Sequence, residues 1–199
     1  MVLKNPNKYE SGKTTVLFIR HGDRIKMDGK KEVGIRIPGP SLSTLGKKQA
    51  KDIAKKIFRF KEQIDNLYCS NMARAIETAE EISKTINRKP KIIPELSEFN
   101  KCIWEKKIFK LKFWRAFKRY ISSFKALDNI LKENKGKFIV IVAHGNVIKG
   151  LILKKLGLSF KQISYFHHTN CAISSARFSG TKLDHINCFN SKDIVLGGE

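Results

Sequence analysis

Short hydrophobic runs alternate with amphipathic stretches along most of the chain. Such short apolar runs are typical of buried strands, and the clearest of them, 138–143, contains no polar residue. Strands that alternate with helical patterns predict a mostly parallel central sheet with helices on both faces, a three-layer α/β/α sandwich. The expected strands are 14–19, 66–69, 91–93, 138–143, 172–178 and 184–189.

Apolar residues that recur at helical spacing predict four amphipathic helices. Ser43 is a good N-cap for the first, which begins near Leu45 and carries lysines on its polar face. The second helix has Arg74 in its first turn, directly beyond a strand. Residues 106–134 predict a helix that is broken once, and the last helix begins near Val147.

Length and composition indicate one ordinary globular unit. The chain has 199 residues, of which 41% are hydrophobic, so residues 1–199 are expected to form a single domain around one core. The sequence has neither the run of about eighteen apolar residues that a transmembrane helix needs nor the apolar core of a secretory leader. We therefore expect no transmembrane segment and a cytoplasmic location.

Four cysteines are scattered along the chain: Cys69, Cys102, Cys171 and Cys188. They form no Cys-x-x-Cys pair, and no pair of histidines at metal-ligand spacing lies near them. The pattern therefore predicts reduced thiols, with neither a zinc site nor a disulfide framework.

The formal net charge is +22, from 40 Lys and Arg against 18 Asp and Glu. Such a positive field attracts anions of any kind, including phosphorylated metabolites, nucleic acid and acidic membranes. The lysines are spread along the whole chain, so a lysine-rich composition explains the charge better than a dedicated binding tail does.

Arginine and histidine residues stand where three of the predicted strands end. Arg20 and His21 follow the first strand, Arg74 follows the second, and His144 follows 138–143. Because the carboxyl ends of parallel strands share one edge of a sheet, we expect these side chains to meet. Clustered cations repel one another unless an anion neutralises them, so a phosphate or similar oxyanion is the expected ligand. The same charge disfavours protonation of an imidazole, which can then attack phosphorus.

Five segments of the chain, in this order, resemble motifs of the histidine phosphatase superfamily, which has the phosphoglycerate-mutase-like fold. They span most of the sequence and are far more specific than Arg-His-Gly alone. The chain is therefore identified as a member of the phosphatase branch with the Arg-His-Gly motif. The segments are Phe18–Gly22, Leu42–Ala50, Cys69–Ala79, Leu96–Glu98 with Trp104–Glu105, and Val142–Gly145.

The resemblance implies a role for each matched residue. His21 would be the nucleophile that takes the phosphoryl group, while Arg20, Arg74 and His144 would hold its equatorial oxygens. Glu98 would protonate the leaving oxygen and then activate water. No metal or other cofactor is expected, because these side chains already supply the positive charge that a metal ion would bring.

Further residues are expected around the pocket. Arg24, Asn146 and Asn170 are candidate substrate-binding residues, and the backbone N–H groups of Gly22 and Asn146 are candidate anion donors. The expected partner is a small phosphorylated substrate, and the basic rim suggests that this substrate carries a second negative group. Residues 95–125 are expected to form a lid or acid-loop insertion within the domain.

The chain also departs from the family pattern. Arg24 and Met27 occupy positions where relatives often have threonine or serine and asparagine, so the rim of the pocket is unusual. Cys102 stands where a glycine is common in the acid loop. Glu105 is a second candidate for the acid, although a structural role in the loop is favoured for it.

Two alternatives to hydrolysis stay open. A phosphoglycerate mutase would need a longer insertion and an arginine-containing loop that this sequence does not show. A non-catalytic polyanion-binding protein is favoured by Lys101–Arg119, where eight basic residues and several aromatics accompany one acid. We interpret this segment as a lid helix, and we do not expect nucleic acid as a partner, because no recognition motif accompanies the charge. His167 and His168 are predicted to lie in a polar loop.

Overall fold

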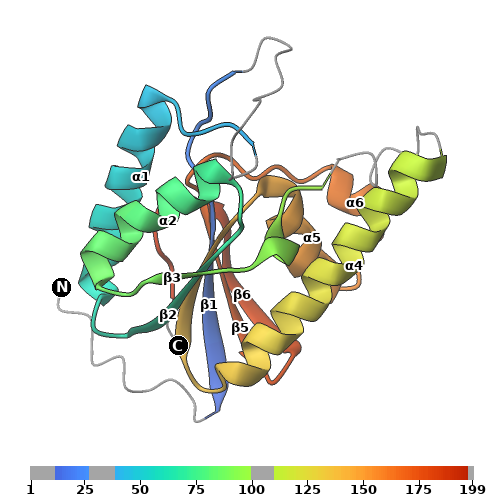
Figure 1. Cartoon of the computed structure of the whole chain (residues 1–199). Helices are drawn as coiled ribbons and strands as arrows, with labels where there is room; N and C mark the ends of the chain where they lie inside the picture. The colour runs from blue at the N-terminus through green and yellow to red at the C-terminus, as the bar shows by residue number, and fades with distance from the viewer. Residues whose placement is uncertain (1–11, 27–38, 100–109, 197–199) are drawn as a thin grey trace.

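The computed structural model describes residues 12–26, 39–99 and 110–196, and a six-stranded sheet forms its centre (Figure 1). The strand order is β3-β2-β4-β1-β5-β6, so β4 and β1 lie in the middle. Every residue of β4 is buried, as expected for a central strand covered on both faces. The strands are β1 Lys13–Arg20, β2 Ile64–Cys69, β3 Pro90–Ile92, β4 Phe138–Ala143, β5 Ile173–Ser179 and β6 Lys182–Ser191.

The direction of the strands places three strand ends together. β4 pairs in parallel with β1 and with β2, and β2 pairs in parallel with β3. Only β5 runs the other way, antiparallel to both β1 and β6. The mostly parallel sheet predicted from the sequence is confirmed, and the carboxyl ends of β1, β2 and β4 point to the same edge.

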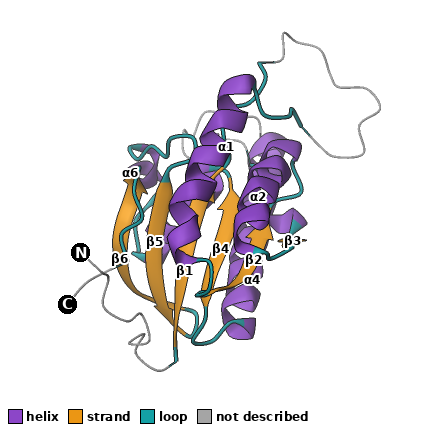
Figure 2. Ribbon diagram, turned by 90° about the vertical axis from the view of Figure 1, so that its left-hand side faces the viewer, coloured by secondary structure: helices purple, strands orange, loops and turns teal. Residues whose placement is uncertain are grey.

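Helices cover both faces of the sheet (Figure 2). Side chains of β1 point alternately to the two faces of the sheet. Leu17 and Ile19 pack in the core with α1 and α2. Val16 and Phe18 pack in the other core, with α4 and α5. The predicted three-layer sandwich is confirmed. The helices are α1 Thr44–Ile57, α2 Ala73–Ile86, α4 Lys110–Glu133, α5 Gly145–Lys155 and α6 Phe160–Ser164, with 3-10 turns η1 Phe58–Phe60 and η2 Pro94–Leu96.

Local predictions agree closely with these bounds. β4 has the predicted limits, and Ser43 caps α1 by accepting a hydrogen bond of 3.1 Å from the Gly46 N–H. β2 begins at Ile64, two residues before its predicted start, and its pairing with β4 shifts register between Ile64 and Asn66, as at a bulge. Periodicity alone does not reveal such a bulge.

The predicted break in the helix at 106–134 is wrong for the residues that the structure describes. α4 runs without interruption from Lys110 to Glu133. This stretch contains neither glycine nor proline, and the Ser123 hydroxyl donates back to the Tyr120 carbonyl at 2.7 Å. Residues 106–109 lie outside the described residues.

The amphipathic character predicted for this helix is visible from Trp114 onward. Ala116 and Tyr120 are buried in the core, while Lys118 and Arg119 are exposed. Trp114 is 55% exposed on the outer face. The described part of α4 therefore turns its apolar side to the core and its cations outward. The basic residues from 101 to 109 lie outside the described residues.

The expected absence of a transmembrane segment can be compared with the described helices. None of the described helices combines the length and the apolar character that crossing a bilayer requires.

Cys69, Cys171 and Cys188 are free thiols, whereas Cys102 lies outside the described residues. Burial raises the pKa of the Cys69 and Cys171 thiols to about 12, so both are protonated at neutral pH.

Helix α1 meets the loop after β1 at two glycines. A Cβ atom on Gly22 would lie 2.6 Å from the Gly46 carbonyl oxygen, and one on Gly46 would lie 1.9 Å from the Asp23 carbonyl oxygen. Neither position has room for a side chain. The close approach holds the loop that follows His21 against the start of α1.

We predict that Gly46→Ala lowers the free energy of unfolding by about 1–3 kcal/mol, because the new methyl group forces α1 away from this loop. Urea unfolding measures the change, and Lys47→Ala, an exposed position in the same turn, is the matched control. Equal urea midpoints for the two variants would show that the contact is not tight.

Candidate active site

Four cationic or imidazole side chains meet at the edge of the sheet where β1, β2 and β4 end. Arg20 is the last residue of β1, and His21 follows it. Arg74 lies in the first turn of α2, and His144 caps α5 directly after β4. The ring centroids of His21 and His144 are 5.0 Å apart, with an angle of 59° between the planes. The structure thus brings together the side chains that the sequence places at separate strand ends.

The imidazole of His21 is held by one hydrogen bond on each nitrogen. Nδ1 lies 2.6 Å from the Gly22 carbonyl oxygen, which can only accept, so Nδ1 carries the proton. Nε2 accepts from Nε of Arg74 at 3.0 Å. This tautomer leaves the lone pair on Nε2, the nitrogen that faces the other site residues.

Burial and charge keep His21 neutral. Loss of solvent is the larger cause, and the positive charge of Arg74 is the next; together they lower the pKa of the imidazole to about 3. At neutral pH the ring is therefore an uncharged base. A neutral imidazole among arginines is the form that a nucleophilic histidine needs.

His144 is fully buried beside His21. Its Nε2 lies 2.8 Å from the Ser70 hydroxyl, which accepts a hydrogen bond from the Met72 N–H at 3.2 Å. That hydroxyl can donate its own proton to Nε2, which leaves the proton of His144 on Nδ1. Nδ1 has no hydrogen-bond partner within the described part of the chain, and burial holds the pKa of the ring well below its ordinary value. A buried donor without a partner is an expected ligand contact.

The guanidinium of Arg20 is held through one of its nitrogens. Its Nη1 donates to the His168 carbonyl oxygen, and a Cβ atom on Gly145 would lie 3.4 Å from its Nε. That Nε is buried, and no described residue gives it a hydrogen-bond partner. Like Nδ1 of His144, it is a donor that a bound anion would satisfy.

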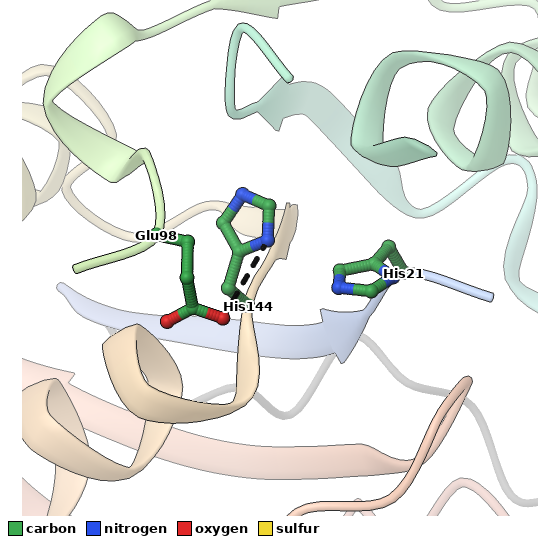
Figure 3. A group of neighbouring side chains, drawn as sticks. All are labelled: His21, Glu98 and His144. Atoms are coloured by element: carbon green, nitrogen blue, oxygen red, sulfur yellow. Dashed lines mark ion pairs between the residues drawn. The ribbon is translucent and has the colours of Figure 1, made fainter. Parts of the chain in front are cut away.

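The carboxyl group of Glu98 lies beside His144 (Figure 3). Its Oε2 lies 3.9 Å from Nδ1 of His144, and its Oε1 is buried without a hydrogen-bond partner among the described residues. Burial raises the pKa of the carboxyl group to about 7, against the opposing effects of Arg74 and Arg20. Near neutral pH the group can both donate and accept a proton. The second acid candidate, Glu105, lies outside the described residues.

Contacts from α4 and α5 hold the acid loop in place. The Glu98 carbonyl accepts from Arg119 and the Phe99 carbonyl accepts from Asn146, both at 3.3 Å. Phe99 is buried and meets the ring of Tyr120 edge to face, at a centroid distance of 5.8 Å. Asn146, a predicted substrate-binding residue, thus lies next to the acid.

The remaining predicted pocket residues have different positions. Arg24 is exposed beside the site, and its backbone forms a bridge with Leu42. The amide of Asn170 donates to the main-chain carbonyl of His21 at 3.3 Å, so it supports the loop. The expectation that the Gly22 N–H is open to an anion is wrong, because this group donates to Thr78 Oγ1 at 3.1 Å. Met27 lies outside the described residues.

Three residues that hold the site were not assigned a role from the sequence. Thr78 accepts from Gly22 and donates to the Arg74 carbonyl at 2.7 Å, and the spacing of four between Arg74 and Thr78 was the available signal. Ser70 contacts His144. His168 lies in a loop, as predicted, but it is buried, and its Nε2 lies 2.9 Å from the Ser174 hydroxyl.

His21, Glu98 and His144 also have the donor types of a metal site, and their ligand atoms lie within 4.8 Å of one another. Arg20 and Arg74 act on the same groups as positive charges. These charges oppose a bound cation and favour a bound anion. The electrostatics therefore fit an oxyanion better than a metal ion.

A model of one protein family matches most of the chain. A family model described as "Histidine phosphatase superfamily (branch 1)" matches residues 16–123 and 123–190. No curated protein sequence gives a significant match.

Solved structures share the fold at low sequence identity. Bacillus stearothermophilus YhfR has a TM-score of 0.71 and 19% identity, covering 89% of this chain and 97% of that one. A mycobacterial glucosyl-3-phosphoglycerate phosphatase has a TM-score of 0.68 and 18% identity, covering 90% and 100%. Phosphoserine phosphatase from Entamoeba histolytica, with bound 3-phosphoglyceric acid, has a TM-score of 0.59 and 23% identity, covering 88% and 98%.

We predict that His21 stays unprotonated until the pH falls to about 3, and that Arg74→Gln raises its pKa by removing the nearest positive charge. Nitrogen NMR of labelled histidine follows the titration, and Arg177→Gln on β5 is a control that removes a distant arginine. Titration of His21 near 6.5 in the unaltered protein would contradict this description of the site.

Proposed function

Since the chain belongs to the histidine phosphatase superfamily, we propose that it hydrolyses small phosphomonoesters through a phosphohistidine on His21, with Glu98 as proton donor. The observation that carries the proposal is the neutral Nε2 of His21, hydrogen-bonded to Arg74 and close to a carboxyl group with a pKa of about 7. A nucleophile, cations for the phosphoryl oxygens and a proton donor are then present in one place.

In the first step, as substrate binds, the Nε–H of Arg74 passes from Nε2 of His21 to a phosphoryl oxygen. The lone pair on Nε2 that this releases attacks phosphorus, and the bond from phosphorus to the ester oxygen breaks. An alkoxide leaves poorly, so the proton of Glu98 passes to the departing oxygen. The products are an alcohol, a phosphohistidine and the Glu98 carboxylate. The proton on Nδ1 stays in its hydrogen bond to the Gly22 carbonyl, which shares the positive charge that forms on the ring.

In the second step the Glu98 carboxylate takes a proton from water, and the oxygen of that water attacks phosphorus. The bond from phosphorus to Nε2 breaks and returns the electron pair to His21, while inorganic phosphate leaves. Glu98 is protonated again. A pKa near neutrality suits a group that acts first as an acid and then as a base.

The charge that spreads over the phosphoryl oxygens is met by fixed donors. The open Nε of Arg20 and the open Nδ1 of His144 are two of these, and Arg74 is the third. The first two are held by the protein before substrate arrives, so only Arg74 must exchange one hydrogen-bond partner, Nε2 of His21, for a phosphoryl oxygen. Phosphatases among the structures with the same fold support this class of reaction.

We predict that His21→Ala removes turnover of every phosphomonoester, because the variant lacks the imidazole nitrogen that accepts the phosphoryl group. Mass spectrometry of the unaltered protein, quenched at high pH during turnover, should find phosphate on His21. Circular dichroism checks the fold of the variant. An adduct on another residue would overturn the proposal, as would rapid isomerisation of 3-phosphoglycerate without release of phosphate.

A second prediction concerns the proton. Glu98→Gln should lower kcat/KM for alkyl phosphates by about 10²–10⁴-fold, and far less for p-nitrophenyl phosphate, whose leaving group needs little protonation. For alkyl esters the unaltered enzyme should lose activity as the pH rises through about 7, where Glu98 loses its proton. The variant should lack this decline.

Glu95→Gln is the matched control, because Glu95 is an exposed acid three residues away. It should retain the activity and the pH profile of the unaltered enzyme. Equal losses on alkyl and aryl esters in Glu98→Gln would place the proton donor elsewhere.

A further inference from the structure

The site contains more positive charge than one phosphoryl group needs. Arg20 and Arg74 are largely buried beside His21 and face the position of the transferred group. Arg24 is a third guanidinium, exposed at the rim. Its charge disfavours protonation of His21 and lowers the pKa of Arg74, so it belongs to the same electrostatic site.

The backbone of Arg24 is fixed. Arg24 forms an antiparallel bridge with Leu42, and the neighbouring Ile25 N–H donates to the Ser41 carbonyl at 3.0 Å. On the other side, the Ser43 N–H donates to the Asp23 carbonyl at 3.0 Å. The side chain therefore projects from a short paired segment that packs against the start of α1.

No carboxylate of the described residues neutralises Arg24. The adjacent acid, Asp23, accepts from the Ser43 hydroxyl at 2.6 Å, and its N–H donates to Gln49 at 2.8 Å. Asp23 is therefore hydrogen-bonded to the N-cap residue and to the first turns of α1. Arg24 has neither an ion pair nor a side-chain hydrogen bond with any described residue, so its guanidinium is available to a ligand.

Three side chains other than Arg24 can already bind the oxygens of the transferred phosphoryl group. A phosphoryl group in transfer presents three equatorial oxygens, and Arg20, Arg74 and His144 provide donors for them. Arg24 differs from this set because it is exposed, whereas Arg74 and His144 are buried, yet its charge acts on His21 and Arg74.

We propose that Arg24 forms a second anion-binding subsite at the rim, and that the substrate is a phosphomonoester whose alcohol portion carries a carboxylate or a second phosphate. This inference rests on the proposed function. A guanidinium fork binds either kind of oxyanion with two parallel hydrogen bonds, so Arg24 selects for charge and geometry at this position. It acts on the leaving portion of the substrate and takes no part in the bond changes.

Matched substrate pairs test the subsite. One pair is glycerol 3-phosphate and 3-phosphoglycerate, which differ by a carboxylate; the other is fructose 6-phosphate and fructose 1,6-bisphosphate, which differ by a phosphate. The unaltered enzyme should favour the charged member of at least one pair by about tenfold in kcat/KM, the size expected for a charged hydrogen bond. The pair that shows the preference identifies the second anion.

Arg24→Gln should reduce that preference to nearly one, mainly through a higher KM for the charged member, whereas Arg24→Lys should restore part of it. Lys26→Gln is the matched control, because it removes one charge from the same exposed stretch, two residues away. This control should keep the preference of the unaltered enzyme.

Three results would overturn the subsite. They are an unaltered enzyme that is active but shows no preference in either pair, a preference that survives Arg24→Gln, and an equal loss on charged and uncharged esters. The last would mean that Arg24 holds the transferred phosphoryl group itself. An unaltered enzyme that hydrolyses none of these esters, nor p-nitrophenyl phosphate, would instead overturn the proposed function together with the subsite.

Discussion

The hydrogen bond from Arg74 to Nε2 of His21 is the contact on which the rest of the site depends. It requires a lone pair on Nε2, so it selects the tautomer with the proton on Nδ1, where the Gly22 carbonyl accepts it. The arginine charge and the loss of solvent keep the ring neutral. The contact with Arg74 thus helps to set the position, tautomer and protonation state of the His21 imidazole.

Helix α2 and two loops hold this pair and its neighbours in place. Thr78 of α2 joins the Gly22 N–H to the Arg74 carbonyl, which ties the β1 loop to the helix that carries the arginine. In the loops after β2 and α6, Ser70 contacts His144, and the His168 carbonyl accepts from Arg20. Nε of Arg20 and Nδ1 of His144 are buried and have no hydrogen-bond partner among the described residues, so a bound anion would satisfy them. Donors that the protein holds in place in this way are expected of a preorganised anion site.

Much of this arrangement could be predicted from the sequence, because its signals are local. The apolar runs that end in Arg20-His21 and in His144 predict strand ends, and parallel strands bring such ends to one edge of the sheet. The support of Arg20 by His168 could not be predicted, since it joins residues 148 positions apart through a backbone carbonyl. The orientation of Asn170 and the engagement of the Gly22 N–H likewise depend on tertiary packing that no periodicity encodes.

A crystal structure with bound orthovanadate is the most direct test of the central claim. Vanadate adopts the five-coordinate geometry of a phosphoryl group in transfer. The account predicts a bond from vanadium to Nε2 of His21, with equatorial oxygens on Arg20, Arg74 and His144 and an axial oxygen near Glu98. Vanadate bound to another nucleophile, or held away from His21 by these cations alone, would contradict it.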